Sequence, residues 1–177
     1  EVMAIGRNFQ ESLHKALRGL ETGVDGLDEM LTSYDDESLH KLRQELRIPR
    51  GERLWYVADA CRAGMTLAEI NACSRIDPWC LVQIDDLVKA DNALRGQSLS
   101  AIDAAAMRLL KRRGFSDRRL ARLLSCSEDE LRGHRHALGV RPVYKRVDSC
   151  AAEFASSTAY LYSTYDEECE AAPSDRE

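Results

Sequence analysis

Apolar residues recur at intervals of three or four through most of the chain, the spacing that places side chains on one face of a helix. The first run follows Asn8 and consists of Phe9, Leu13, Leu17 and Leu20. Asn8 and Glu11 stand three residues apart, as the two partners of a capping box do at a helix start. The pattern predicts an amphipathic helix that ends before Gly23.

The next segment, residues 23–34, contains two glycines and shows no helical period, so it is predicted to be a loop. A second helix is predicted from residue 35 or 36 to residue 48. Acidic residues 35–37 stand at its start, where the helix dipole favours negative charge, and Pro49 ends it. Its apolar stripe consists of Leu39, Leu42 and Leu46.

A third helix is predicted over residues 52–63 and stops at Gly64. Thr66 and Glu69 then form a capping-box pattern for a short helix. An aspartate at position 77 followed by a proline indicates the start of the longest helix, which runs to residue 94. Apolar side chains cover more than half of its circumference, so we expect it to be the central helix. These side chains are Trp79, Leu81, Val82, Ile84, Leu87 and Val88.

Another helix is predicted to begin at Ser100, with Asp103 three residues later, and to stop at Gly114. Its inward-facing residues are expected to be Ile102, Ala106, Leu109 and Leu110. Two short helices follow over residues 116–124 and 127–138, the second with a capping-box pattern at its start. The sequence thus predicts an all-α fold, an irregular multi-helix domain.

The C-terminal part of the chain, residues 141–165, has a different character. Pro142, a Ser-Ser-Thr run at 156–158 and the alternation of Tyr160 and Tyr162 disfavour a long helix and favour extended or irregular chain. Residues 166–177 are acidic and contain a proline, which is typical of a linker. We therefore expect an extended, irregular C-terminal arm on the helical body.

Charge is distributed unevenly along the chain. The net charge is −5, yet residues 108–146 hold 12 Lys or Arg against 4 Asp or Glu. Such a basic stretch indicates either a nucleic-acid footprint or a face that meets an acidic surface inside a larger protein. The two short helices also have the pattern of a helix-turn-helix, with Arg132 and Arg135 expected to be exposed. The alternatives are a nucleic-acid-binding module and an ordinary packing unit of a helical domain.

Candidate chemistry is sparse. The six cysteines form no C-x-x-C pair, which argues against a zinc site or a redox motif and favours reduced, cytoplasmic thiols. His134 and His136 are two residues apart on a helix and point away from each other. Phosphate-binding glycine loops and nucleophile motifs are absent from the sequence, and no apolar run approaches the ~20 residues of a membrane span. We expect no catalytic, cofactor-binding or metal-binding residue here, and no membrane partner.

Two stretches carry a resemblance to a known family. Residues 1–21, EVMAIGRNFQESLHKALRGLE, and residues 141–177, which contain KRVDSCAAEF, closely resemble the large subunit of glutamine-hydrolysing carbamoyl-phosphate synthase. The middle, including RLWYVADACRAGMTLAEI, looks like the same protein. That family has two homologous ATP-grasp halves, which phosphorylate bicarbonate and carbamate, and it receives ammonia from a glutaminase small subunit.

The resemblance implies a parent ligase that makes carbamoyl phosphate for arginine and pyrimidine biosynthesis, using ATP with Mg or Mn and K. It implies that residues 1–22 end the first ATP-grasp half, that residues 23–142 form a non-catalytic oligomerisation domain, and that residues 143–177 are an arm and linker into the second half. The expected partners are those two halves, other large subunits and the glutaminase subunit, in the cytoplasm. The basic helices would then face neighbouring domains or subunits rather than nucleic acid.

Self-association, if it occurs, needs an apolar face that remains after the core is built. We expect this face on the second helix, at Leu39, Leu42 and Leu46. In this interpretation Leu39 reaches a partner while the other two pack inward. Periodicity alone leaves open the alternative that all three leucines are ordinary core residues.

The arm carries four charged residues that alternate with apolar ones: Lys145, Arg146, Asp148 and Glu153. This pattern suits charge-assisted hydrogen bonds that hold the arm between two large domains. The alternative is that these charges are exposed to solvent on a loop.

Overall fold

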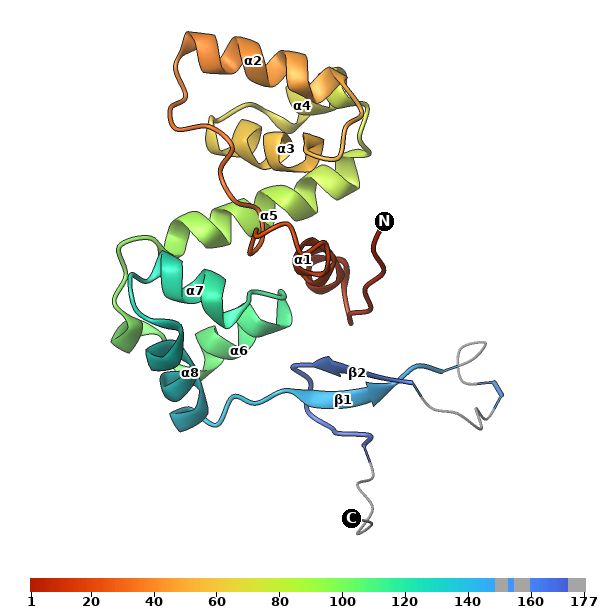
Figure 1. Cartoon of the computed structure of the whole chain (residues 1–177), viewed down its shortest axis with the longest axis vertical. Coiled ribbons are helices and arrows are strands. Elements are labelled where there is room, and N and C mark those ends of the chain that lie inside the picture. Colours follow the sequence, from red (N-terminus) through yellow and green to blue (C-terminus); the bar gives the residue numbers. More distant parts are fainter. Residues whose placement is uncertain (149–152, 155–159, 172–177) are drawn as a thin grey trace.

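The computed structural model describes residues 1–148, 153–154 and 160–171 and consists mainly of helices (Figure 1). The helices are α1 (Phe9–Gly19), α2 (Asp36–Arg47), α3 (Arg53–Arg62), α4 (Leu67–Ser74), α5 (Pro78–Leu94), α6 (Ala104–Arg112), α7 (Asp117–Leu123) and α8 (Glu128–Ala137). A 3-10 turn, Leu99–Ala101, precedes α6, and the arm forms two short strands, β1 (Val143–Arg146) and β2 (Leu161–Thr164). The predicted all-α body with an extended arm is confirmed.

Helix α5 runs through the middle of the molecule and connects two groups of helices (Figure 1). At one end α2, α3 and α4 pack on one another and on α5; we call them the N-terminal group. At the other end α7 packs on α8 and on α5, with α6 beside them; these three helices are the C-terminal group. Helix α1 packs on α5 between the two groups.

The helix starts that the sequence predicted are closed by side-chain caps. Asp35 accepts a hydrogen bond from the amide of Ser38 at the start of α2. The Thr66–Glu69 and Ser127–Glu130 pairs form complete capping boxes at α4 and α8, because in each pair both reciprocal bonds are present. These predictions are therefore confirmed at the level of individual hydrogen bonds.

Helix α1 packs through a more polar face than its leucine pattern suggested. Its buried residues are Gln10, Glu11, His14 and Leu17, whereas Leu20 is exposed. Asn8 caps the amide of Glu11, as predicted, but the Glu11 carboxylate accepts from the amide of Arg7 (2.7 Å) rather than that of Asn8. The pattern located the helix but placed its buried face incorrectly.

The reason is a close approach between α1 and the turn after α6. A Cβ on Gly114 would lie 2.8 Å from the Cα of Glu11, and Gly114 has φ +86°, so only glycine fits there without strain. This approach brings backbone carbonyls within reach of α1 side chains. His14 Nδ1 lies 2.9 Å from the carbonyl oxygen of Arg113, and Arg18 donates to the carbonyl of Gly114 at 2.7 Å.

Helix α5 is central, as predicted, but two of its apolar residues face outward. Leu81, Ile84 and Leu87 are buried, whereas Trp79 and Val82 are 57% and 42% exposed. Positions three apart share a helix face, so Trp79 and Val82 lie together on the face that flanks the start of α1. There the rings of Phe9 and Trp79 meet edge to face, with centroids 5.2 Å apart. The expectation that these two residues are buried is wrong.

Helix α6 begins later than predicted. Asp103, not Ser100, supplies the cap, because its carboxylate accepts from the amide of Ala106 at 2.8 Å. The buried residues of the helix are Met107, Leu110 and Lys111, whereas Leu109, which was expected to face inward, is 53% exposed. Ile102 is buried, as expected, but lies before the helix rather than in it.

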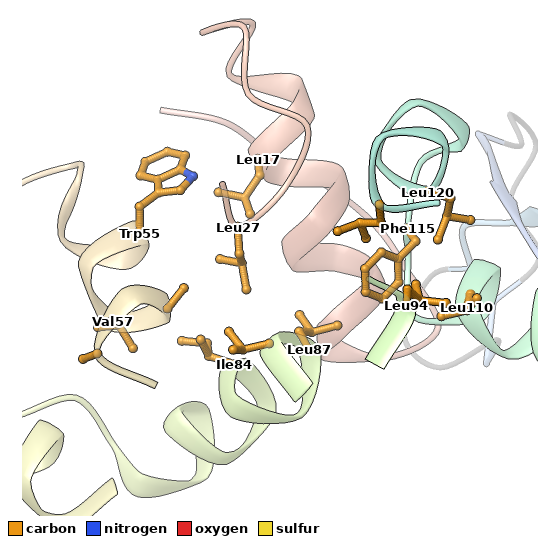
Figure 2. Close-up of a cluster of buried hydrophobic side chains, with 14 of the residues drawn as sticks. Leu17, Leu27, Trp55, Val57, Ile84, Leu87, Leu94, Leu110, Phe115 and Leu120 are labelled. Atoms are coloured by element: carbon orange, nitrogen blue, oxygen red, sulfur yellow. The ribbon is translucent and has the colours of Figure 1, made fainter. Parts of the chain in front are cut away.

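The hydrophobic core extends from α3 across α5 to the C-terminal group (Figure 2). Trp55 of α3 points toward Leu17 of α1 and Leu27 of the predicted loop, and its indole nitrogen donates to the carbonyl of Gly26 at 2.9 Å. Phe115 and Leu120 close the other end of the cluster. Segment 23–34 is thus irregular, as predicted, but it contributes to the core.

In the arm, β1 and β2 pair antiparallel, with Val143 opposite Thr164 and Arg146 opposite Leu161. Extended chain was predicted here, but strand pairing was not. The Ser-Ser-Thr run at 156–158 lies outside the described residues.

Candidate functional site

The three leucines proposed for self-association occupy two different environments. Leu42 and Leu46 are fully buried (0% exposed) in the core of the chain itself, and only part of Leu39 is covered. Of the three, Leu39 is therefore the residue whose side chain can reach a partner. Its helix start is fixed by the Asp35 cap and by a contact between the Ser33 and Ser38 hydroxyls at 3.3 Å.

The outer face of α2 around Leu39 is strongly charged. Its exposed residues are Asp36, Glu37, His40, Lys41, Arg43, Gln44 and Arg47. Both signs occur on this face, so two copies related by a two-fold axis can place opposite charges against each other. A contact through this face would thus be centred on the partly buried Leu39 and surrounded by polar and charged side chains. Self-association itself remains a prediction.

Asp59 of α3 fixes the chain that leads into α2. Its carboxylate accepts from the amides of Met30 (2.8 Å) and Leu31 (2.9 Å) and from the Tyr34 hydroxyl (3.2 Å), and it pairs with Arg62 at 2.9 Å. Burial, together with the charge of Asp59, raises the pKa of Tyr34 to about 12. Sequence reasoning missed this role, although an aspartate inside the apolar run of α3 was a signal.

In the arm, the charged residues differ in what they contact. Lys145 is buried and its Nζ lies 3.0 Å from Glu170 Oε1, and this hydrogen bond raises the pKa of Lys145. The amide of Arg146 donates to the other oxygen of Glu170 at 2.8 Å. Asp148 and Glu153 are exposed. Lys145 and Arg146 thus tie the segment after β2 to β1, within the arm itself.

The arginines of α7 are paired inside the chain. Arg119 is buried, and its guanidinium bonds Asp91 of α5 at 2.9 Å. Arg118 bonds Asp25 at 2.6 Å, and Arg122 lies 3.1 Å from the same carboxylate. Asp28 extends the set through contacts with both Arg119 and Arg122. An acidic loop, residues 25–29, therefore pairs with the arginines of α7 and offsets their positive charge.

The basic residues of α8 are also paired, contrary to the helix-turn-helix interpretation. Arg135 was expected to be exposed but is buried, with Nη2 2.7 Å from Asp117 Oδ2. Arg132 contacts Glu128 at 2.6 Å and Asp129 at 3.1 Å. A helix that reads a DNA groove must present free side chains to base edges. The nucleic-acid-binding alternative is therefore not supported.

That the basic helices face neighbouring domains or subunits stays a prediction, and Arg118, Arg122 and Arg132 keep exposed side chains on them. The signal that was available for the pairing of α7 is the acidic composition of residues 25–29, but nothing in the sequence showed that this loop lies beside α7.

A cavity of about 450 Å³ lies between the end of α1 and the starts of α7 and α8. Its lining includes four carboxylates and two arginines: Arg18, Glu21, Asp25, Asp117, Arg118 and Glu128. Within residues 1–148, 153–154 and 160–171, no group of three His, Cys, Asp or Glu side chains is arranged to hold a metal ion. The helices of the same residues include none that is long and apolar enough to cross a membrane.

Comparison with known proteins gives a consistent result. The family model of the carbamoyl-phosphate synthetase large chain, oligomerisation domain, matches residues 1–139. The carbamoyl phosphate synthase large chain of Pseudomonas syringae pv. tomato is 64% identical over 177 residues, and that of Xanthomonas axonopodis pv. citri is 59% identical over 180. The large chain of Neisseria meningitidis serogroup B is 58% identical over 176 residues.

These alignments cover 99% or more of the present chain but 16% of each relative. The all-helical body, the match over most of its length and the identity to these large chains agree with one another. The chain belongs to the family of carbamoyl-phosphate synthetase large-chain oligomerisation domains.

Proposed function

We propose that this chain is a non-catalytic oligomerisation and linker domain of a large chain that makes carbamoyl phosphate. In that reaction bicarbonate, glutamine-derived ammonia and two ATP are consumed, for arginine and pyrimidine biosynthesis in the cytoplasm. The observation that carries the proposal is the family match over residues 1–139. The pairing of the basic helices with acids of the same chain supports it, because it removes the rival function.

The proposed division assigns residues 1–22 to the end of the preceding ATP-grasp half, 23–142 to the oligomerisation domain and 143–177 to the arm and linker. Its partners are the two ATP-grasp halves, other large chains and a glutaminase subunit. The close contact of α1 with Gly114 and α5 implies that the end of the first half is seated firmly on the oligomerisation domain. The arm begins after α8, and its strand β2 lies beside α1, where Lys15 donates to the carbonyl of Ser163 (Figure 1).

The nucleotide and metal sites of the parent enzyme are assigned to parts of the large chain beyond these positions. The cavity between α1, α7 and α8 does not fit a nucleoside triphosphate, because four carboxylates line it and would repel the phosphates. No residue of this chain is therefore given a role toward ATP, Mg, Mn or K.

For self-association we propose the face of α2 that contains Leu39. Leu42 and Leu46 support this face from within, since they fix α2 on α3 and α4. A two-fold contact would bring Leu39 of one copy close to Leu39 of the other, surrounded by charges of both signs. The central position of a half-buried leucine in a polar surround matches the usual anatomy of a small interface.

The test is sedimentation velocity on the unmodified chain and on the Leu39→Glu variant, with Leu109→Glu on α6 as the matched control. Both substitutions place a charge at a partly exposed leucine of a helix. Only Leu39→Glu is expected to dissociate the assembly, because a buried unpaired charge at an interface is costly. Circular dichroism should show unchanged helicity for both variants.

An assembly that persists in Leu39→Glu while its thermal unfolding temperature collapses would contradict the α2 face. Equal dissociation by Leu109→Glu would contradict it as well.

A further inference from the structure

The arm returns to the helical body at Tyr165, the residue that follows β2. The Tyr165 ring lies over two cations of the C-terminal group: Lys111 Nζ is 5.1 Å from its centroid and Arg135 Cζ is 5.8 Å. Its carbonyl oxygen accepts a hydrogen bond from Arg112 Nε at 2.9 Å. Ring and backbone of one arm residue are thus both held by side chains of α6 and α8.

The two cations are positioned by the body and do not depend on the arm. Lys111 Nζ donates to the carbonyl of Phe115 (2.6 Å) and to Asp117 (2.8 Å). Arg135 bonds the same Asp117 carboxylate at 2.7 Å and donates to the carbonyl of Val140 at 2.9 Å. We call Lys111, Arg135 and Asp117 the cation seat. Because its contacts lie within residues 111–140, the seat can form without the arm.

The seat carries an excess of positive charge away from water. Two cations share one carboxylate, and both Lys111 and Arg135 are buried. Burial lowers the pKa of Lys111 to about 8 against the opposing attraction of Asp117. The negative face of an aromatic ring compensates such a charge when the cation lies within about 6 Å of the centroid, and more strongly when the site is desolvated.

Two of the other ties between arm and body are ion pairs that include an exposed side chain. Arg7 lies 3.2 Å from Asp166, and Arg112 lies 3.7 Å from Glu167, but each pair includes a largely exposed side chain. Exposed ion pairs of this kind contribute little. Lys15 of α1 makes a further tie to β2, because its Nζ donates to the carbonyl of Ser163 and lies 5.6 Å from the centroid of the Tyr162 ring. A two-stranded hairpin is marginally stable by itself, so β1 and β2 depend on this docking.

We infer that Tyr165 is the anchor that holds the arm on the helical body, and that the arm is released as a unit when the ring leaves the cation seat. The body stays folded, because the seat is satisfied by its own hydrogen bonds. The anchor sets the direction in which the chain leaves β2. That it orients the following part of a large chain rests on the proposed function, but the docking itself does not.

The test is amide hydrogen exchange on the 177-residue chain and three variants. Tyr165→Leu removes the ring, Tyr165→Phe keeps it without the hydroxyl, and Tyr144→Leu makes the same change at an exposed tyrosine of β1. Tyr165→Leu is expected to speed exchange in β1 and β2 by about tenfold, because it removes two cation–ring contacts. The other two variants should match the unmodified chain, and α5 should be unchanged in all.

A second readout is the pKa of Lys111 followed by NMR. In Tyr165→Leu water reaches the ammonium group, so its pKa should rise from about 8 toward its ordinary value of 10.5. Three results would overturn the inference: strands that stay protected in Tyr165→Leu, release of the arm by Tyr165→Phe to the same extent, or equal acceleration in α5. None of these results depends on whether the chain self-associates, so this inference and the proposed function fail separately.

Discussion

The two helical groups on either side of α5 are held together in different ways. The N-terminal group is built mainly on apolar contacts: Leu42, Leu46, Val57, Ala58 and Ile70 are all completely buried, and the Asp59–Arg62 pair of α3 is buried beside them. The C-terminal group buries Lys111, Arg119 and Arg135 among its leucines, and each is matched by a carboxylate of α5, α7 or the 25–29 loop. The first group depends on one buried carboxylate, Asp59, within a hydrophobic core, whereas the second requires charged partners at several positions.

This difference matters for how each group responds to substitution. Truncation of an apolar side chain in a core costs the transfer energy of the missing atoms and the cavity that they leave. A buried ion pair adds little net stability when intact, but removal of one partner leaves an uncompensated charge. Apart from Asp59 and Arg62 of α3, substitutions of polar residues should therefore cost more in the C-terminal group than in the N-terminal group.

The largest effect is expected for Arg119→Met. This substitution removes the guanidinium closest to the buried Asp91 and leaves it the more distant Arg95 (3.4 Å) and Arg62 (3.6 Å). The free energy of unfolding should fall by roughly 3–5 kcal/mol. Arg122→Met is the matched control on the same helix, because Arg122 pairs with acids of the same loop but its side chain is 53% exposed. That control should lose less than about 1 kcal/mol. Urea unfolding followed by circular dichroism compares the two, and equal losses would contradict a buried ion-pair core.

Next in size is Leu42→Ala in the N-terminal group. Truncation of a fully buried leucine should lower the free energy of unfolding by roughly 2–5 kcal/mol. Leu39→Ala, one turn earlier on α2, should cost far less, because that side chain is only partly covered. The pair is measured by urea unfolding at a chain concentration low enough to exclude association. Similar losses would place Leu39 in the core and remove the proposed contact face.

Acid should act mainly where α1 meets the C-terminal group. Burial lowers the pKa of His14 to about 4, although the hydrogen bond to the Arg113 carbonyl opposes this shift. Between the unfolded value of about 6.5 and pH 4 the unfolded chain binds a proton that the folded chain excludes, so stability falls as the pH falls. The loss should reach about 3 kcal/mol at pH 4. His14→Gln should remove this loss of stability between pH 6.5 and pH 4. Urea unfolding that gives parallel pH profiles for the two chains would contradict the role of His14.

The smallest effect, loss of a helix cap, should be the same in both groups. Thr66→Ala in α4 and Ser127→Ala in α8 each remove one side-chain acceptor from a complete capping box. Each should lower the free energy of unfolding by about 1 kcal/mol, because a cap acts locally whatever the core around it contains. Urea unfolding of the two variants measures this. A loss of stability several times larger for Ser127→Ala than for Thr66→Ala would contradict this, because it would mean that the packing of the C-terminal group depends on the cap of α8.

The sequence correctly predicted the features that depend on residues close together in the chain. Helix starts at Asp35, Thr66, Asp77 and Ser127 were correct, since a cap and its target amide lie within three residues of each other. The loop over residues 23–34 and the extended arm were also correct. In α6 two capping candidates, Ser100 and Asp103, competed, and the wrong one was favoured.

What could not be predicted depends on residues far apart in the chain. Arg119 and Asp28 are 91 positions apart, and only the folded structure shows that they pair. The contact of His14 with the Arg113 carbonyl and that of Tyr165 with Arg135 also join residues far apart in the sequence. A charge pattern shows that partners are needed but does not show which ones, so Arg135 was expected to be exposed but is buried against Asp117. The sequence also does not show what Leu39 contacts in the proposed assembly, because that partner is another molecule.

The central claim is that the helical body brings copies of the chain together. Sedimentation equilibrium of the unmodified chain over a wide range of concentrations tests it most directly. We expect the weight-average mass to rise with concentration from that of one chain toward a whole multiple of it, and the Leu39→Glu variant to stay at the mass of one chain. An unmodified chain that keeps the mass of a single copy at every concentration would contradict the claim.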